Sequence, residues 1–75
     1  MDIQEICNVI NSHLKQNNKV VLFLKFGKSY NVTHCWYSEK NEHFMSLQFI
    51  DSDNIEKYVE IVTEQIAAIE YHYIK

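Results

Sequence analysis

Residues 33–45, THCWYSEKNEHFM, bring two histidines, a cysteine, a tryptophan, a tyrosine and two acids into thirteen positions, side chains that could bind a metal or act in catalysis. A zinc site needs four nitrogen or sulfur ligands, commonly in pairs two to four residues apart. His34 and Cys35 are adjacent, and neighbouring side chains of a strand point to opposite sides of a sheet. His34 and His43 could meet across a hairpin, but they supply only two ligands. The spacing therefore predicts no metal site and no cofactor.

The two cysteines are also poor candidates for catalysis. A nucleophilic cysteine needs a depressed thiol pKa and a base within hydrogen-bond reach. The sequence has no third group at a recognisable spacing to orient such a base, no glycine-rich phosphate loop and no paired-carboxylate motif. We therefore expect no catalytic residues and no enzymatic activity, and we expect Cys7 and Cys35 to be small buried side chains.

Aromatic side chains in the same part of the sequence indicate a binding surface. The rings with lysines near them are Tyr30, Trp36, Tyr37 and Phe44, with Lys28 and Lys40. Such a set can stack single-stranded bases or a nucleotide. The interpretation we favour is that the rings fill a core or a subunit interface, where Tyr and Trp are enriched. The segment from Lys40 to Phe44 is the predicted point of contact with a ligand or partner.

A helix and three strands are expected to position these residues. Residues 2–16 have apolar side chains at spacings of three and four, with Asp2 as the N-cap and Asn17-Asn18 as the stop. Residues 19–26, 29–37 and 43–50 are predicted strands, separated by a turn at Gly27-Lys28 and by the polar turn 38–42. Within 29–37, simple alternation predicts that Tyr30, Val32, His34 and Trp36 share one face.

Residues 55–74 allow two interpretations. Apolar residues recur there at helical spacing, and Asp53 with Glu56 could form a capping box, which predicts a helix over 54–74 and an α-β-β-β-α chain. However, the segment is rich in β-branched residues and tyrosine and has no leucine, which favours strands. We prefer two short strands, about 57–63 and 67–74, hinged at residues 64–66.

Read as a helix followed by five strands, the chain resembles the Sm-like family, the small barrels of Sm, LSm and Hfq proteins. VVLFLKFGKSYNV is similar to the first hairpin of that family, EHFMSLQF to its acidic-x-aromatic-Met-Asn segment, and YVEIVTEQIAAIEY to its last two strands. The resemblance implies a mainly β fold, with an N-terminal helix and a five-stranded Sm-like or SH3-like barrel. It also implies RNA contacts, which would fall on His43, Phe44, Ser46, Thr63 and Gln65. Glu64 stands where the family has a positive group.

Composition predicts one domain over residues 1–75, because the chain is short, 47% apolar, and has one glycine and no proline. A domain of this size buries only about 60% of its unfolded surface. We therefore expect a homo-oligomer, in which copies of the chain complete the burial.

Charge and residue bias bear on the partner. Residues 15–40 contain five lysines and one glutamate, a net charge of +4, whereas residues 41–74 contain seven acids and one lysine, a net charge of −6. This division favours contact with a protein or another copy over contact with a polyanion. The seven cationic side chains are all lysine, and the Ile, Asn, Lys and Tyr bias is typical of an AT-rich genome, such as that of a low-GC bacterium or its phage.

These observations predict a regulatory or inhibitory protein-interaction module of phage or mobile-element type. The alternative is an Sm-like protein that binds single-stranded RNA or a nucleotide. The sequence shows no basic leader and no apolar run of the ~20 residues that a membrane span requires. We therefore expect a cytoplasmic protein without membrane contact, located in the host cytoplasm if a phage encodes it.

Overall fold

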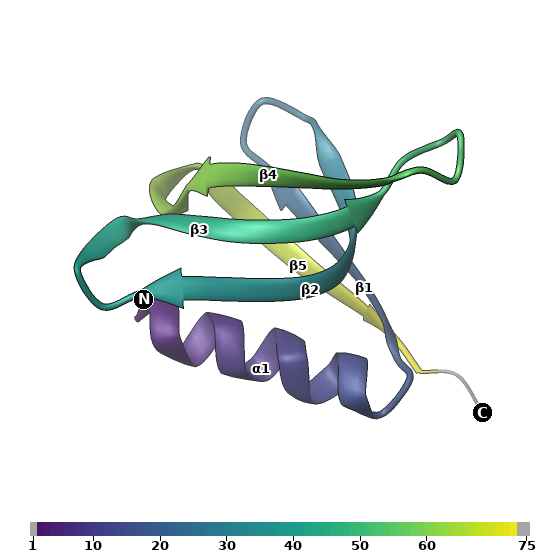
Figure 1. The fold of residues 1–75 in the computed structure, drawn as a ribbon, viewed down its shortest axis with the longest axis horizontal. Helices are drawn as coiled ribbons and strands as arrows, with labels where there is room; N and C mark the ends of the chain where they lie inside the picture. The colour runs from purple at the N-terminus through teal and green to yellow at the C-terminus, as the bar shows by residue number, and fades with distance from the viewer. Residues whose placement is uncertain (1, 74–75) are drawn as a thin grey trace.

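The computed structural model describes residues 2–73, which form one helix and one five-stranded antiparallel sheet (Figure 1). The elements are α1 (Ile3–Lys15), β1 (Lys19–Leu24), β2 (Ser29–Ser38), β3 (Asn41–Ile50), β4 (Glu56–Val62) and β5 (Ile66–His72). The predicted mainly β fold with an N-terminal helix is confirmed, and the alternative helix over 54–74 is wrong. The expected end of the last strand at residue 74 lies outside the described residues.

The sheet has the strand order β4-β3-β2-β1-β5, and it curls around a single core. Figure 1 shows β1 and β5 crossing β2, β3 and β4 at a steep angle. Side chains from both halves of the sheet meet inside, among them Leu22 of β1, Met45 of β3 and Ile61 of β4. A short 3-10 turn, Thr63–Gln65, joins β4 to β5.

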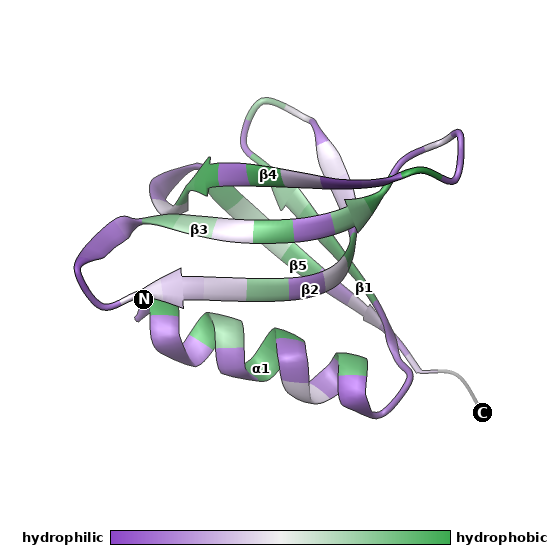
Figure 2. Cartoon of the chain, viewed as in Figure 1, coloured by the Kyte–Doolittle hydropathy of each residue, from purple (hydrophilic) through white to green (hydrophobic). Residues whose placement is uncertain are grey.

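Helix α1 covers this core with its apolar face, mainly along β2. The Asp2 side chain accepts a hydrogen bond of 2.9 Å from the backbone N–H of Gln4 and so caps the first turn. The chain leaves the helix through Asn17, whose φ of 61° is the left-handed conformation that asparagine tolerates. Figure 2 shows the hydropathy alternating along the helix and along β3. The predicted helix and both of its boundary signals are confirmed.

An extra residue in β2 reverses the side of the sheet that each later residue of the strand faces. Val32 pairs with Phe49 but His34 pairs with Gln48, so Thr33 forms a β-bulge. Tyr30 and Val32 point into the core, and after the bulge Cys35 takes that position while His34 and Trp36 point outward. The expectation that Tyr30, Val32, His34 and Trp36 share one face is therefore wrong. One inserted residue inverts the facing of all that follow.

A helix side chain replaces a strand as the partner of β2 just beyond the bulge. The β1–β2 pairing extends only to Val20 opposite Val32, which leaves the next part of β2 without a neighbour on that side. The Asn11 amide fills this gap: its Oδ1 accepts from the backbone N–H of Cys35 at 3.2 Å, and its Nδ2 donates to the Cys35 carbonyl at 2.9 Å. Asn11 thus reproduces the pair of bonds that a neighbouring strand would make.

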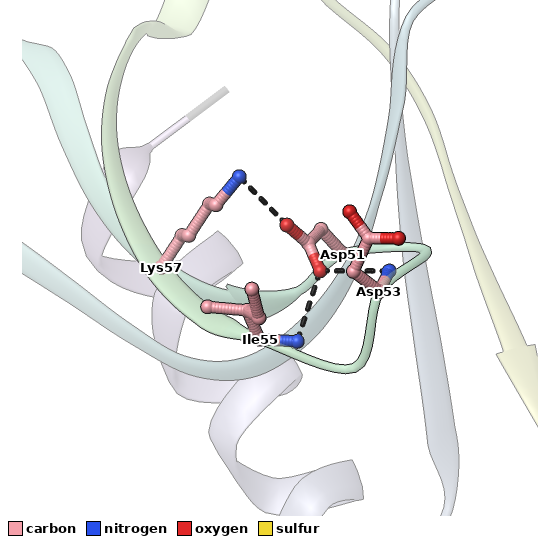
Figure 3. Close-up of polar contacts among 4 residues, drawn as sticks. All are labelled: Asp51, Asp53, Ile55 and Lys57. Atoms are coloured by element: carbon pink, nitrogen blue, oxygen red, sulfur yellow. Dashed lines mark hydrogen bonds and ion pairs between the residues drawn. The ribbon is translucent and has the colours of Figure 1, made fainter.

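The turn between β3 and β4 is organised by Asp51 (Figure 3). Its Oδ1 accepts from the backbone N–H groups of Asp53 and Ile55, at 3.0 and 2.9 Å, and its Oδ2 lies 2.6 Å from Lys57 Nζ. The capping box considered for the helical alternative does not form, because Asp53 lies in this turn. The bond from Lys57, followed by the Ile55 N–H, holds the pKa of the Asp51 carboxyl below its ordinary value.

Candidate functional site

Within residues 2–73, strands β2, β3 and β4 have an outward-pointing side that neither the helix nor β1 and β5 cover (Figure 1). This side is called the outer face. The register of the three strands arranges its side chains in rows that cross the strands. Read from β2 through β3 to β4, three rows have a residue from each strand: Trp36, Ser46 and Glu60; His34, Gln48 and Tyr58; and Asn31, Ile50 and Glu56. A fourth row has Phe44 with Val62.

Three rings occupy the centre of the outer face. The Trp36 and Tyr58 rings stack with centroids 5.9 Å apart and an interplanar angle of 30°, and the His34 ring lies 4.3 Å from that of Trp36. Strands two positions apart in a sheet are about 10 Å apart, so Trp36 and Tyr58 must lean over β3 to meet. Trp36 is 40% exposed and Tyr58 is 69% exposed. The rings therefore form an ordered aromatic layer in contact with solvent.

The charge of the outer face is negative. Glu56 and Glu60 flank Tyr58 along β4, and the side chain of Gln48 donates a hydrogen bond to Glu56. The only lysine of β4, Lys57, alternates to the other side and pairs with Asp51. No lysine lies on the outer face as defined here. The arrangement lacks the cationic groups that bind phosphate and carries the groups that bind a cation.

The β2–β3 hairpin tip lies against the 3-10 turn. Beyond Tyr37 opposite Met45 the register shifts to Ser38 opposite Asn41, so 42–44 have no partner in β2. The Thr63 hydroxyl lies 3.2 Å from the Glu42 carbonyl and 3.3 Å from the His43 carbonyl, and so can donate to either. The two loops to which the family resemblance assigns RNA contacts are therefore adjacent.

The structure divides the eight candidate binding residues among different places. Trp36, Phe44 and Ser46 belong to the outer face, and Lys40, His43 and Thr63 to the hairpin tip and the 3-10 turn beside it. Tyr37 is half-buried and packs against the core. Gln65 is exposed and lines a hollow with Phe26, in which Glu60 and Val62 of the outer face also take part.

Other residues considered for chemistry are also separated. Tyr30 is buried with its ring edge-on to Phe49, and Lys28 Nζ lies 5.2 Å from the Tyr30 ring centre. His34 faces Gln48, so it does not meet His43 across the hairpin. Within residues 2–73, no three His, Cys, Asp or Glu side chains are grouped as a metal site would require.

Both cysteines lie in the core, as predicted, and are free thiols. Burial raises the pKa of the Cys35 thiol and of the Cys7 thiol. The Asn11 amide also contacts Cys7 Sγ at 3.6 Å. Protonated, enclosed thiols are weak nucleophiles, so these two side chains act in packing.

Sequence reasoning missed Tyr58, Glu56 and Glu60. Pairing residues 43–50 with the next predicted strand would have placed Tyr58 beside the outward residues of β3. The sequence contained this signal, because Val59 and Ile61 alternate with Glu56, Tyr58 and Glu60 as the inward and outward residues of a strand do.

Comparisons of the chain with models of known protein families, with curated proteins and with solved structures found no match. No helix in residues 2–73 combines the length and apolar character needed to span a membrane.

Proposed function

We propose that this chain is a non-enzymatic binding module that contacts a protein partner through the outer face. The observation that carries the proposal is the ordered layer of Trp36, Tyr58 and His34, which keeps large aromatic area in water. Tryptophan and tyrosine are enriched in protein interfaces, where they dominate binding energy. A regulatory or inhibitory role, of the type found in phage or mobile-element proteins, agrees with such a surface on a very small domain.

The proposal includes self-association of the chain. Within residues 2–73, β4 is paired only with β3 and β5 only with β1, so each strand has one unpaired edge. Phe26 is 68% exposed and lines a hollow together with Val62 of β4 and Gln65. Pairing of an edge with another copy would satisfy backbone groups and bury apolar area. Light scattering should give a mass well above 9.0 kDa, and Phe26→Ser should lower it while Val9→Ser, on the helix surface, does not.

A comparison of paired baits tests the partner-binding role. The immobilised wild-type chain, the Trp36→Ala/Tyr58→Ala variant and a Val9→Ala control on the helix surface would be exposed to an extract of a low-GC bacterium. We expect at least one protein to be retained by the wild type and the control and lost by the double variant. Circular dichroism would establish that the double variant is folded. A partner retained equally by all three would contradict the assignment to the outer face.

A second candidate is Sm-like RNA binding at the hairpin tip. It is favoured by the contact of Thr63 with the carbonyls of Glu42 and His43, which joins the two loops that the resemblance names. The hollow beside this contact is lined by Asp2, Glu42 and Glu64, among other residues, and these acids oppose phosphate.

Fluorescence polarisation with U-rich and A-rich single-stranded RNA separates the two candidates. Micromolar binding that weakens steeply with salt, and that Thr63→Ala reduces, would support the RNA function over the protein-interaction function. Absence of binding at high protein concentration would rule out the RNA function.

A further inference from the structure

The chemistry of the outer face indicates which class of partner it accepts. Tyr58 lies between Glu56 and Glu60 on one side of β4, and its ring stacks on that of Trp36. Glu56 is held by its hydrogen bond with Gln48. Glu60 takes part in no ion pair or side-chain hydrogen bond among the described residues. The exposed rings are thus bordered by Glu56, whose carboxylate is already hydrogen-bonded, and by Glu60, whose carboxylate is available to a partner.

We infer that the outer face receives a basic segment of a partner protein, with an arginine or lysine side chain lying over the Tyr58 and Trp36 rings and paired with Glu60. This inference rests on the proposed function and specifies its partner. The face of an aromatic ring carries negative potential and attracts a cation, and a neighbouring carboxylate adds to that attraction. An acidic peptide or a phosphate backbone would instead meet Glu56 and Glu60 without a compensating lysine.

Arginine fits this arrangement better than lysine does. Its planar guanidinium can stack on a ring while its N–H groups reach a carboxylate at the edge, whereas the ammonium of lysine is more strongly hydrated. The chain itself contains no arginine, since its cationic side chains are all lysine. The preferred occupant is therefore a different protein.

Three other hollows of the molecule lack this combination of exposed, stacked rings and an available carboxylate. The hollow beside Thr63 has acids but no aromatic ring among the residues that line it, apart from the imidazole of His43. The hollow beside Phe26 is mainly apolar, and Glu60 lines it together with Phe26, whose ring stacks on no other ring among the described residues. The hollow between α1 and β5 has Tyr71 and Glu5, but Tyr71 is partly buried against the core, whereas Tyr58 is 69% exposed.

Trp36 provides a direct measurement, because it is the only tryptophan of the chain. The full chain would be titrated with short Gly/Ser peptides that carry arginine, citrulline or glutamate at the same positions, and Trp36 emission recorded. Citrulline keeps the planar shape of arginine without its charge. Charge variants would be Glu60→Gln on the outer face and Glu5→Gln on α1 as the matched control.

We expect the arginine peptide to change Trp36 emission and to bind about tenfold more tightly than the citrulline peptide. Glu60→Gln should remove much of that difference, Glu5→Gln should not, and added salt should weaken the arginine peptide. Equal affinity of the arginine and citrulline peptides would overturn the inference, although a Trp36 response to both would leave the proposed function standing. Absence of any change in Trp36 emission would also overturn the inference. The bait comparison tests the proposed function independently of this titration.

Discussion

The two faces of β2, β3 and β4 are made by the same stretches of chain and have opposite properties. On the inner face Cys35, Met45 and Leu47 are almost completely buried, and Asn11 fixes the backbone beside them. On the outer face the alternating positions carry Trp36 and Tyr58, which are exposed and stack on one another, with the His34 ring against that of Trp36. Stability is therefore concentrated on the inner face, and the side chains available for recognition are on the outer face.

This difference indicates which residues of the sheet could be substituted without loss of the fold. Burial of an apolar side chain contributes to the free energy of unfolding in proportion to the area removed from water. Tyr58 is 69% exposed and removes little such area from water, so binding explains its position on the outer face better than folding does. Four substitutions test this division, in decreasing order of expected effect.

Met45→Ala should cause the largest loss. Met45 is 0% exposed, so its truncation leaves a cavity in the core and should lower the free energy of unfolding by about 2–5 kcal/mol. Ser46→Ala, one residue further on the outer face, is the matched control and should change it by less than about 0.5 kcal/mol. Urea unfolding followed by circular dichroism measures both. Similar losses at the two positions would mean that the faces are not divided as described.

Asn11→Ala tests the helix side chain that orders the inner face. It leaves the backbone N–H and carbonyl of Cys35 without their partners and should cost about 1–3 kcal/mol. Faster amide hydrogen exchange at Cys35 should accompany the loss. Ser12→Ala, an exposed neighbour on α1, controls for helix propensity. Unchanged exchange at Cys35 would show that Asn11 does not pair with β2.

Tyr58→Ala probes the outer face. Removing its stack on Trp36 should lower the free energy of unfolding by only about 0.5–1.5 kcal/mol. The emission of Trp36 should shift to the red as its ring becomes more hydrated. A loss as large as that of Met45→Ala would contradict the view that this face contributes little to folding.

Asp51→Asn, in the turn that joins β3 to β4, should have the smallest effect at neutral pH. The folded-state pKa of Asp51 is held below its ordinary value of 3.8, so its charge stabilises the fold above that pH. This stabilisation is lost as pH falls through the folded-state pKa. The variant should therefore be slightly less stable at pH 7 and show less acid destabilisation below about pH 4. Asp53→Asn is the control, and identical acid transitions in the wild type and Asp51→Asn would contradict the role of the carboxylate.

Local patterns were sufficient for most elements. The helix was predicted from the spacing of its apolar residues and from Asp2 and Asn17, because these signals act within one turn. The last two strands were predicted from their content of β-branched residues and tyrosine and from the lack of leucine, although Asp53 and Glu56 also allowed a helix. Propensity favoured strands correctly there, since Val59 and Ile61 pack into the core from the edge of a sheet.

The candidate site was only partly accessible from sequence. Trp36, Phe44 and Ser46 were identified, but Tyr58, Glu56 and Glu60 were not, because they come from a strand whose pairing was not followed through. Tyr37 and Gln65 were grouped with the others by proximity in sequence or by resemblance. Neither proximity in sequence nor resemblance to a family shows which side of the sheet a side chain faces, because that depends on the strand register.

The sequence by itself determined the single helix, the strands and most of their turns, since each follows from contacts between residues a few positions apart. Only the tertiary structure decided which side of β2 faces the core. The bulge at Thr33 inverts the facing, and it is defined by the pairing of β2 with β3 and lies beside the Asn11–Cys35 hydrogen bonds, both of which join residues distant along the chain. That same inversion brings His34 and Trp36 to the outer face beside Tyr58. The aromatic surface therefore exists because of one inserted residue whose effect no local pattern could show.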